Sequence, residues 1–131
     1  MAKWHGISRR KPTGGRLKRP NRYRGKRRTE VASEKQFAFV GDKDIRKNYR
    51  KRANSQTVRS LSVKSVNVNI PKEGKTIITN VVNVVGNDAD SNFVRRNIVT
   101  KGAILETEMG KVRVTSRPGM HGVVSGILIE E

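Results

Sequence analysis

The second half of the chain is a series of short apolar stretches separated by turn residues, and this pattern predicts β structure. From Leu61 to Ile70 the later apolar residues occur at every second position, which is the period of a half-buried strand. The stretch from Thr76 to Val85 is rich in Ile and Val. Its apolar residues occur as adjacent pairs, and the spacing of these pairs along the chain also fits the period of a helix. Because β-branched residues dominate, we predict a strand that contains a bulge or is buried on both faces.

Turn residues divide the C-terminal part into further strands. Met109 and Gly110 are flanked by residues 103–108 and 111–115 and predict a tight hairpin. A last apolar strand is expected from Val123 to Ile129. Short strands at this spacing are typical of a small barrel or sandwich, so we predict a mainly β fold with a small β-barrel-like domain.

The region before these strands is more polar and less regular. Residues 34–41 predict a first strand with Phe37 and Phe39 on one face. Residues 43–52 form either a short helix or a basic loop. Ile45 and Tyr49, four positions apart, favour the helix.

The segment from Met1 to Arg28 has few apolar residues, and glycine and proline interrupt any regular element. Such a segment cannot bury enough surface to offset its ordering entropy when free, although it could order against a polyanion. We therefore predict a long, basic, irregular N-terminal extension. On this basis residues 1–33 form a basic arm, and residues 34–131 form the β domain, with a basic insertion near 43–60.

Charge is distributed as unevenly as apolar residues. The chain has 131 residues, 29 Lys and Arg, and 11 Asp and Glu, for a net charge of +18. Met1 to Ser60 holds 20 of the basic and 4 of the acidic residues, whereas Leu61 to Glu131 holds 9 and 7. The first 28 residues hold 12 basic residues and no acid. Charge and fold thus lie in different parts of the chain, and the charge predicts a polyanionic partner.

Composition also excludes several classes of protein. There is no cysteine, which excludes disulfides and thiolate zinc sites. No long apolar run, amphipathic basic helix or lipidation signal points to a membrane. No apolar stretch follows the basic N-terminus as in a secretory signal, so we expect a cytoplasmic protein.

Basic residues that recur every few positions in the arm are the strongest functional signal. At this density Lys and Arg contact successive phosphates and release counterions, and Arg adds forked hydrogen bonds and stacking. A solubilising tail or a nuclear-import patch is the alternative. The candidate arm residues are Arg9, Arg10, Lys11, Arg16, Lys18, Arg19, Arg22, Arg24, Lys26, Arg27 and Arg28.

Thr13, Gly14 and Gly15 precede Arg16 within this arm. Two glycines let the backbone adopt positive φ and approach a phosphate closely, with Arg16 completing the contact. A flexible hinge is the alternative. The stretch lacks the ending of a P-loop, so nucleotide hydrolysis is not indicated.

The β domain offers fewer candidates for contacting RNA. Arg50 and Arg52 belong to the basic insertion, and three others, Arg95, Arg96 and Lys101, flank an expected strand. A solvated rim is the alternative for the latter three. Pro118 and Gly119 would form a rigid turn that presents Arg117, although a turn alone does not require an arginine.

Other chemistry is weakly represented. Trp4 and His5 could stack on a base, or Trp4 could pack against the β domain. Glu106 and Glu108 resemble an acid pair, but a solvent-facing hairpin edge opposite basic residues explains them better. No metal-ligand spacing is present. We therefore expect neither an enzyme nor a cofactor, and no small-molecule substrate.

Eight short motifs extend from Trp4 to Gly119. They are Trp4-His5-Gly6, Ser8-Arg9-Arg10-Lys11, Thr13-Gly14-Gly15-Arg16, Lys26-Arg27-Arg28, Arg95-Arg96-Asn97-Ile98, Thr100-Lys101-Gly102-Ala103, Glu106-Thr107-Glu108-Met109-Gly110 and Val114-Thr115-Ser116-Arg117-Pro118-Gly119. In these motifs and their order the chain resembles the archaeal members of S8e, an archaeal and eukaryotic family of small-subunit ribosomal proteins. The resemblance implies a β-barrel-like domain with a basic extension on small-subunit ribosomal RNA, beside other small-subunit proteins, and no enzymatic role.

Two positions depart from the family pattern. Arg52-Ala53-Asn54 stands where members usually have a Gly-Gly-Asn turn, so the backbone and its RNA contacts could differ there. Met120-His121-Gly122 replaces the usual Gln-Asp-Gly.

A structural protein of the small ribosomal subunit is therefore our hypothesis, with RNA recognised by shape and phosphate more than by base edges. A ribosome-assembly factor that binds pre-ribosomal RNA is the second hypothesis. A DNA-compacting protein is the third, although no helix-turn-helix pattern supports it.

Overall fold

The computed structural model describes residues 3–4, 8, 10–18, 28–32 and 34–129. It divides into two compact units, Met1–Lys35 and Gln36–Glu131. The first unit contains a two-stranded antiparallel sheet, β1 (Lys3–Trp4) with β2 (Val31–Ala32), and a 3-10 helix η1 (Arg28–Glu30). The backbone of Trp4 thus pairs with Val31, on the far side of the basic segment.

The second unit is built around a closed barrel, which confirms the predicted mainly β fold with a small barrel-like domain. Its strands pair in the order β10 (Gly110–Val114), β11 (Ser125–Leu128), β6 (Ser65–Ile70), β7 (Lys75–Gly86) and β9 (Ile104–Thr107). All neighbours are antiparallel except β11 and β6, which pair in parallel and join the last strand to the first barrel strand. Closure leaves none of the five strands with an unpaired edge.

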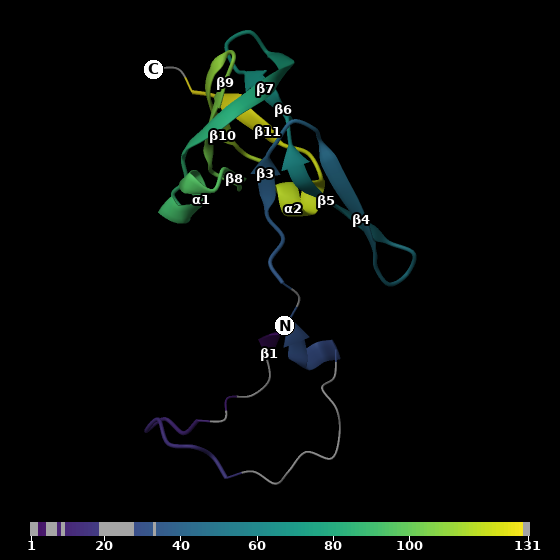
Figure 1. Cartoon of the computed structure of the whole chain (residues 1–131). Helices are drawn as coiled ribbons and strands as arrows, with labels where there is room; N and C mark the ends of the chain where they lie inside the picture. Colours follow the sequence, from purple (N-terminus) through teal and green to yellow (C-terminus); the bar gives the residue numbers. More distant parts are fainter. Residues whose placement is uncertain (1–2, 5–7, 9, 19–27, 33, 130–131) are drawn as a thin grey trace. The chain divides into compact units, whose positions relative to one another are not determined.

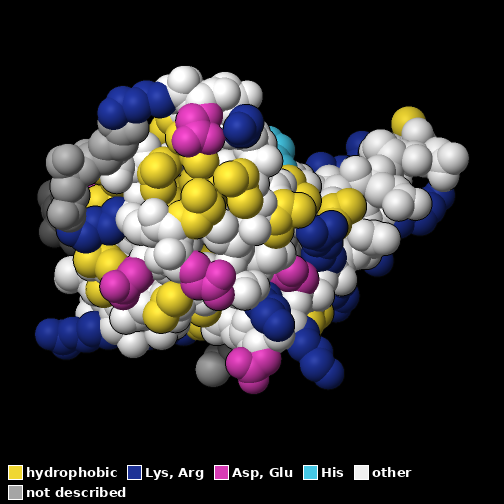
Figure 2. Space-filling model, turned by 90° about the horizontal axis from the view of Figure 1, so that it is seen from above, with side chains coloured by type: hydrophobic (Ala, Val, Ile, Leu, Met, Phe, Trp, Pro, Cys, Tyr) yellow, Lys and Arg dark blue, Asp and Glu magenta, His cyan; other side chains and the backbone are white. Residues whose placement is uncertain are grey.

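A second sheet continues from the barrel in the order β4 (Ile45–Arg50), β5 (Gln56–Val63), β3 (Ala38–Val40) and β8 (Ile98–Val99). Two short helices, α1 (Ser91–Arg95) and α2 (Pro118–His121), lie in the connections before β8 and β11. The hairpin of β4 and β5 extends away from the barrel strands (Figures 1 and 2). It is the most protruding part of this unit in both views.

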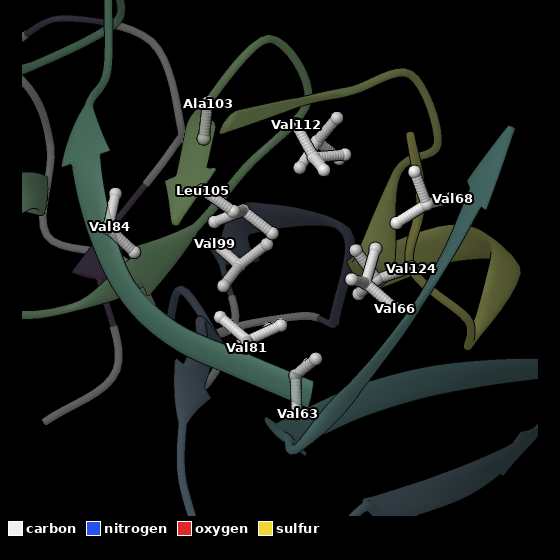
Figure 3. Packing of buried hydrophobic residues seen from close by; sticks show 12 residues of the cluster. Val63, Val66, Val68, Val81, Val84, Val99, Ala103, Leu105, Val112 and Val124 are labelled. Carbon is white, nitrogen blue, oxygen red and sulfur yellow. The ribbon is translucent and has the colours of Figure 1, made fainter. Parts of the chain in front are cut away.

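The core of the barrel consists mainly of valine. Figure 3 shows these side chains converging from the strands on a common centre. The cluster comprises Ala38, Val63, Val66, Val68, Val81, Val84, Val99, Ala103, Leu105, Val112, Val114 and Val124. β-Branched side chains suit strands, and each buried valine stabilises the fold by roughly 1.5 to 3 kcal/mol. The apolar alternation in the sequence therefore identified the inner face correctly.

One close approach in the barrel requires glycine. A Cβ placed on Gly126 in β11 would lie 2.5 Å from Val112 Cγ1 and 2.7 Å from the Arg113 carbonyl oxygen of β10. Only glycine lets these two backbones come so close.

Several element boundaries differ from the sequence predictions. The stretch from Leu61 to Ile70, predicted as one strand, belongs to two strands that meet at Lys64. Residues 45–50 form a strand, so both the helix and the basic loop predicted for residues 43–52 were wrong. Register shifts in β7 near Val81 and Val84 confirm the predicted bulge. The β9–β10 hairpin is confirmed, but its two turn residues are Glu108 and Met109, and Gly110 is the first residue of β10.

Candidate nucleic-acid interface

The β4–β5 hairpin presents the densest group of described cations in the second unit. Its strands pair from Ile45 opposite Ser62 to Arg50 opposite Gln56, and every β4 residue except Tyr49 is exposed. The exposed cations of this hairpin are Lys43, Arg46, Lys47, Arg50, Lys51 and Arg52. Figure 2 shows Lys and Arg side chains along the protrusion at the right, and Asp and Glu side chains on the rest of that face.

The tip of this hairpin is a tight turn with an unusual backbone. Ala53 and Asn54 both have positive φ, 53° and 58°. The Ser55 N–H donates to the Arg52 carbonyl at 3.2 Å, and the Lys51 N–H donates to the Ser55 carbonyl at 2.7 Å. Positive φ at both central residues is the type I′ arrangement, which favours Asn and Gly. The departure at Arg52-Ala53-Asn54 therefore retains a left-handed turn, with alanine in a position that glycine occupies more easily.

Tyr49 organises the base of the hairpin. Its ring lies 5.5 Å from Lys47 Nζ and 5.1 Å from Arg59 Cζ, both within cation–π range. Its hydroxyl donates to Gln36 Oε1 at 2.5 Å. Among the described side chains, Arg59 Nε is one of two buried polar atoms without a hydrogen-bond partner. The ring of Tyr49 thus provides the main favourable contact for the Arg59 guanidinium.

Asp44 is an acid within this basic segment, and it has a structural role. It accepts hydrogen bonds from Ser65 Oγ at 2.6 Å and from the backbone N–H of Lys64 at 2.7 Å. Burial alone would raise the pKa of Asp44, but these bonds and the charge of Arg46 outweigh it and hold the pKa below its usual value. Asp44 therefore fixes the corner where β5 passes into β6.

A second group of cations lies at the end of α1. Arg96 caps this helix, and its Cζ lies 5.8 Å from the ring of Phe37 and 5.9 Å from that of Phe39. The Phe37 ring also packs against Phe93 at 5.2 Å. Arg95, next to Arg96, is exposed. Arg96 is thus positioned by aromatic rings, while Arg95 is directed only by the helix.

Lys101 and Arg117, which are distant in sequence, line the same cavity. Lys101 lies in the turn after β8, and Arg117 is the N-cap residue of α2. The Arg117 N–H donates to His121 Nδ1 at 3.1 Å, so the histidine that replaces the usual family residue supports this cap. The sequence named both cations but gave no sign that they share a site.

The described part of the first unit includes eight of the candidate positions. The backbone of Arg10 pairs with that of Arg16, and Arg10 Nη1 donates to the Gly14 carbonyl at 2.9 Å. Gly14 has φ 85°, the positive value that the sequence predicted there. Thr13, Gly15 and Lys11 complete this turn, while Lys18 and Arg28 are exposed outside it. The candidates Arg9, Arg19, Arg22, Arg24, Lys26 and Arg27 lie outside the described residues.

The acid pair has a simple structural explanation. Glu106 lies opposite Lys111 across the β9–β10 hairpin, whereas Glu108 lies in the turn and accepts from Asn80 Nδ2 at 3.0 Å. Within the described ranges, no three His, Asp or Glu side chains cluster where they could hold a metal ion. None of the helices described is long and apolar enough to cross a membrane.

Several residues of the candidate interface were not selected from the sequence. Arg46, Lys47 and Tyr49 belong to the basic insertion, but only its Arg50 and Arg52 were selected. An aromatic residue flanked by cations is a known signal of nucleic-acid contact and could have identified Tyr49. Phe37 carried no comparable local signal.

Comparisons with known proteins show which family the chain belongs to. The family described as "Ribosomal protein S8e" matches residues 4–129. A protein of Methanosphaera stadtmanae named "Small ribosomal subunit protein eS8" is 43% identical over 130 residues, 99% of this chain and 100% of its own. Proteins of the same name from Methanococcoides burtonii and Methanococcus aeolicus are 46% and 44% identical; the former alignment covers 97% of this chain and 98% of its relative, and the latter covers both chains completely. With a match over almost its whole length, the chain belongs to the S8e family of ribosomal proteins.

Proposed function

We propose that this protein is a structural constituent of the small ribosomal subunit, where it binds ribosomal RNA through the basic arm and through loops of the β domain. The observation that carries the proposal is the separation of charge from core. The barrel buries the valines, while the densest group of exposed cations lies on the β4–β5 hairpin, and Arg10, Lys11 and Arg16 are exposed in the turn of the first unit. Membership of a ribosomal family, a structural and non-enzymatic class, supports the same role.

Phosphate contacts would supply most of the affinity. A protein that neutralises phosphates releases counterions, so its affinity falls steeply with salt. The arm has 12 basic residues and no acid before Thr29, so it contributes more of the salt-dependent affinity than the β domain. Within the subunit the neighbours are other small-subunit proteins, and the compartment is the cytoplasm.

Salt dependence tests the proposal. The affinity of the full chain for small-subunit ribosomal RNA is measured over a range of salt and compared with that of a chain beginning at Thr29. Each lost phosphate contact changes the slope of log affinity against log salt by about 0.7 to 0.9. We expect a markedly shallower slope for the shorter chain. Equal slopes would show that the arm does not contribute to binding.

A triple substitution separates binding from folding. Changing Arg9, Arg10 and Lys11 together to Ala should leave the melting temperature nearly unchanged, because Arg10 and Lys11 are exposed and exposed residues make few native contacts. The same change should weaken incorporation into small subunits, measured by co-sedimentation. Early melting with normal incorporation would show that the arm is part of the fold.

Two further measurements test the alternative functions. Equal affinity for duplex DNA at the same salt would favour a DNA-compacting protein, and absence from mature subunits would favour an assembly factor.

A further inference from the structure

A cavity of about 320 Å³ lies among the segment before β3, the turn after β8 and helix α2. Its volume is at the lower end of the range of small-molecule sites, roughly 300 to 1,000 Å³. Three buried apolar residues, Ala38, Val99 and Pro118, contribute to its lining. The cavity therefore suits one small, largely apolar group.

An aromatic side chain in the wall is held in place before any ligand arrives. Phe37 lines the cavity, and its ring packs against Phe93 at 5.2 Å with the Arg96 guanidinium at 5.8 Å. Contacts to two neighbours restrict the rotamers of Phe37, so a ligand that packs on this wall would not have to order it first.

The remaining lining residues add charge and hydrogen-bonding groups. Lys101 and Arg117 are exposed, and neither has a carboxylate partner among the described residues. Thr100 Oγ1 accepts from Asn87 Nδ2 at 2.8 Å, and Gln36 uses its Oε1 to accept from Tyr49. The Gln36 amide group is therefore oriented with NH₂ as the donor. An apolar lining with two unpaired cations favours a ligand that combines a flat apolar body with an anion.

We propose that this cavity holds a single unpaired nucleobase of the bound RNA, with an adjacent phosphate on Lys101 and Arg117. The inference rests on the proposed RNA-binding function and deepens it by naming the substrate feature that the β domain recognises. A paired base is stacked within its helix and cannot enter such a cavity, whereas a base in a loop or bulge can be splayed out and packed on aromatic and apolar side chains. Gln36 and Thr100 supply hydrogen-bonding groups for its edge.

Binding of the full chain to matched RNA hairpins tests this inference. One hairpin is fully paired, and four others differ from it by a single bulged A, C, G or U. Because packing of a base on an aromatic side chain is favourable, at least one bulged hairpin should bind on the order of ten-fold more tightly than the paired one. With 4-thiouridine at the bulge, crosslinks should map to peptides containing Phe37 or Lys101.

Two variants connect the preference to the cavity. A Cβ on Gly119, which lines the cavity, meets no heavy atom within 4 Å, so Gly119→Leu should occupy the space without a backbone clash. This variant should bind bulged and paired hairpins equally. Thr76→Leu adds the same side chain at an exposed position of β7 and should keep the ten-fold preference.

The outcomes distinguish this inference from the proposed function. If the four bulged hairpins bind no more tightly than the paired one, or if the preference survives Gly119→Leu, the cavity does not hold a base while RNA binding still stands. If none of the hairpins binds in a salt-dependent manner, the proposed function fails, and the inference fails with it.

Discussion

Strands β4 and β6 have the same length, six residues, and opposite relations to the core. In β6 every second residue is buried, with Val68 fully inaccessible to solvent, whereas in β4 only Tyr49 is even partly buried. Burial of one face stabilises β6. β4 depends instead on its ladder to β5, on the turn at Ala53 and on the cations around Tyr49. The same backbone conformation thus supports a core in one region and a charged, accessible surface in the other.

The largest expected effect comes from placing a charge on the buried side of β6. Val68→Asp puts an unpaired carboxylate in the barrel, which should lower the free energy of unfolding by at least about 3 kcal/mol. Such a loss is a large part of the stability of a typical domain. Asn69→Asp, on the exposed side of the same strand, is the matched control and should change the melting temperature little. Similar melting curves for the two variants would contradict the division between inner and outer faces.

The converse change removes charge from the hairpin without touching the core. Replacing Arg50, Lys51 and Arg52 by Ala should reduce the slope of log affinity against log salt for ribosomal RNA by about 2 to 3. Stability should change by less than about 0.5 kcal/mol, because these side chains are exposed. A variant with Lys at positions 50 and 52 keeps the charge and should keep the slope. If the Ala variant keeps the same slope of log affinity against log salt, the hairpin does not contact phosphate.

The smallest effect concerns the hairpin turn. Ala53 has φ 53°, and the left-handed region costs a non-glycine residue roughly 1 to 2 kcal/mol. Ala53→Gly should therefore raise the free energy of unfolding by about 1 kcal/mol or less, since glycine also gains freedom in the unfolded chain. Asn54→Gly is the control, and it should have a smaller effect because asparagine tolerates this region. Chemical denaturation would measure both, and destabilisation by Ala53→Gly would show that the turn is not strained.

The same contrast explains which parts of the fold could be predicted. The β9–β10 hairpin was predicted because its signal, the turn residues Met109 and Gly110 between two short segments, is local. Strand β4 was missed because it buries almost nothing and therefore shows no apolar alternation. Ile45 and Tyr49 suggested a helix, but the partner that makes this segment a strand is β5.

Long-range contacts account for most of what the sequence could not show. The corner at Lys64 depends on Asp44, twenty residues earlier, so residues 61–70 looked like one strand. In the same way Lys101 and Arg117 were named separately, and only the fold brings them to one cavity. Cations could be selected by type, whereas their aromatic partners, such as Phe37 beneath Arg96, depend on tertiary packing.

The position of β4 at the end of its sheet also bears on how the free protein avoids self-association. An end strand exposes backbone hydrogen-bonding groups that could pair with another copy of the chain, and charged side chains are a common defence. Three of the six residues of β4 are Arg46, Lys47 and Arg50, so two copies approaching edge to edge would repel each other. A bound polyanion would neutralise these charges, but it would also cover the same strand. The charges would therefore prevent edge-to-edge pairing for as long as the strand is accessible.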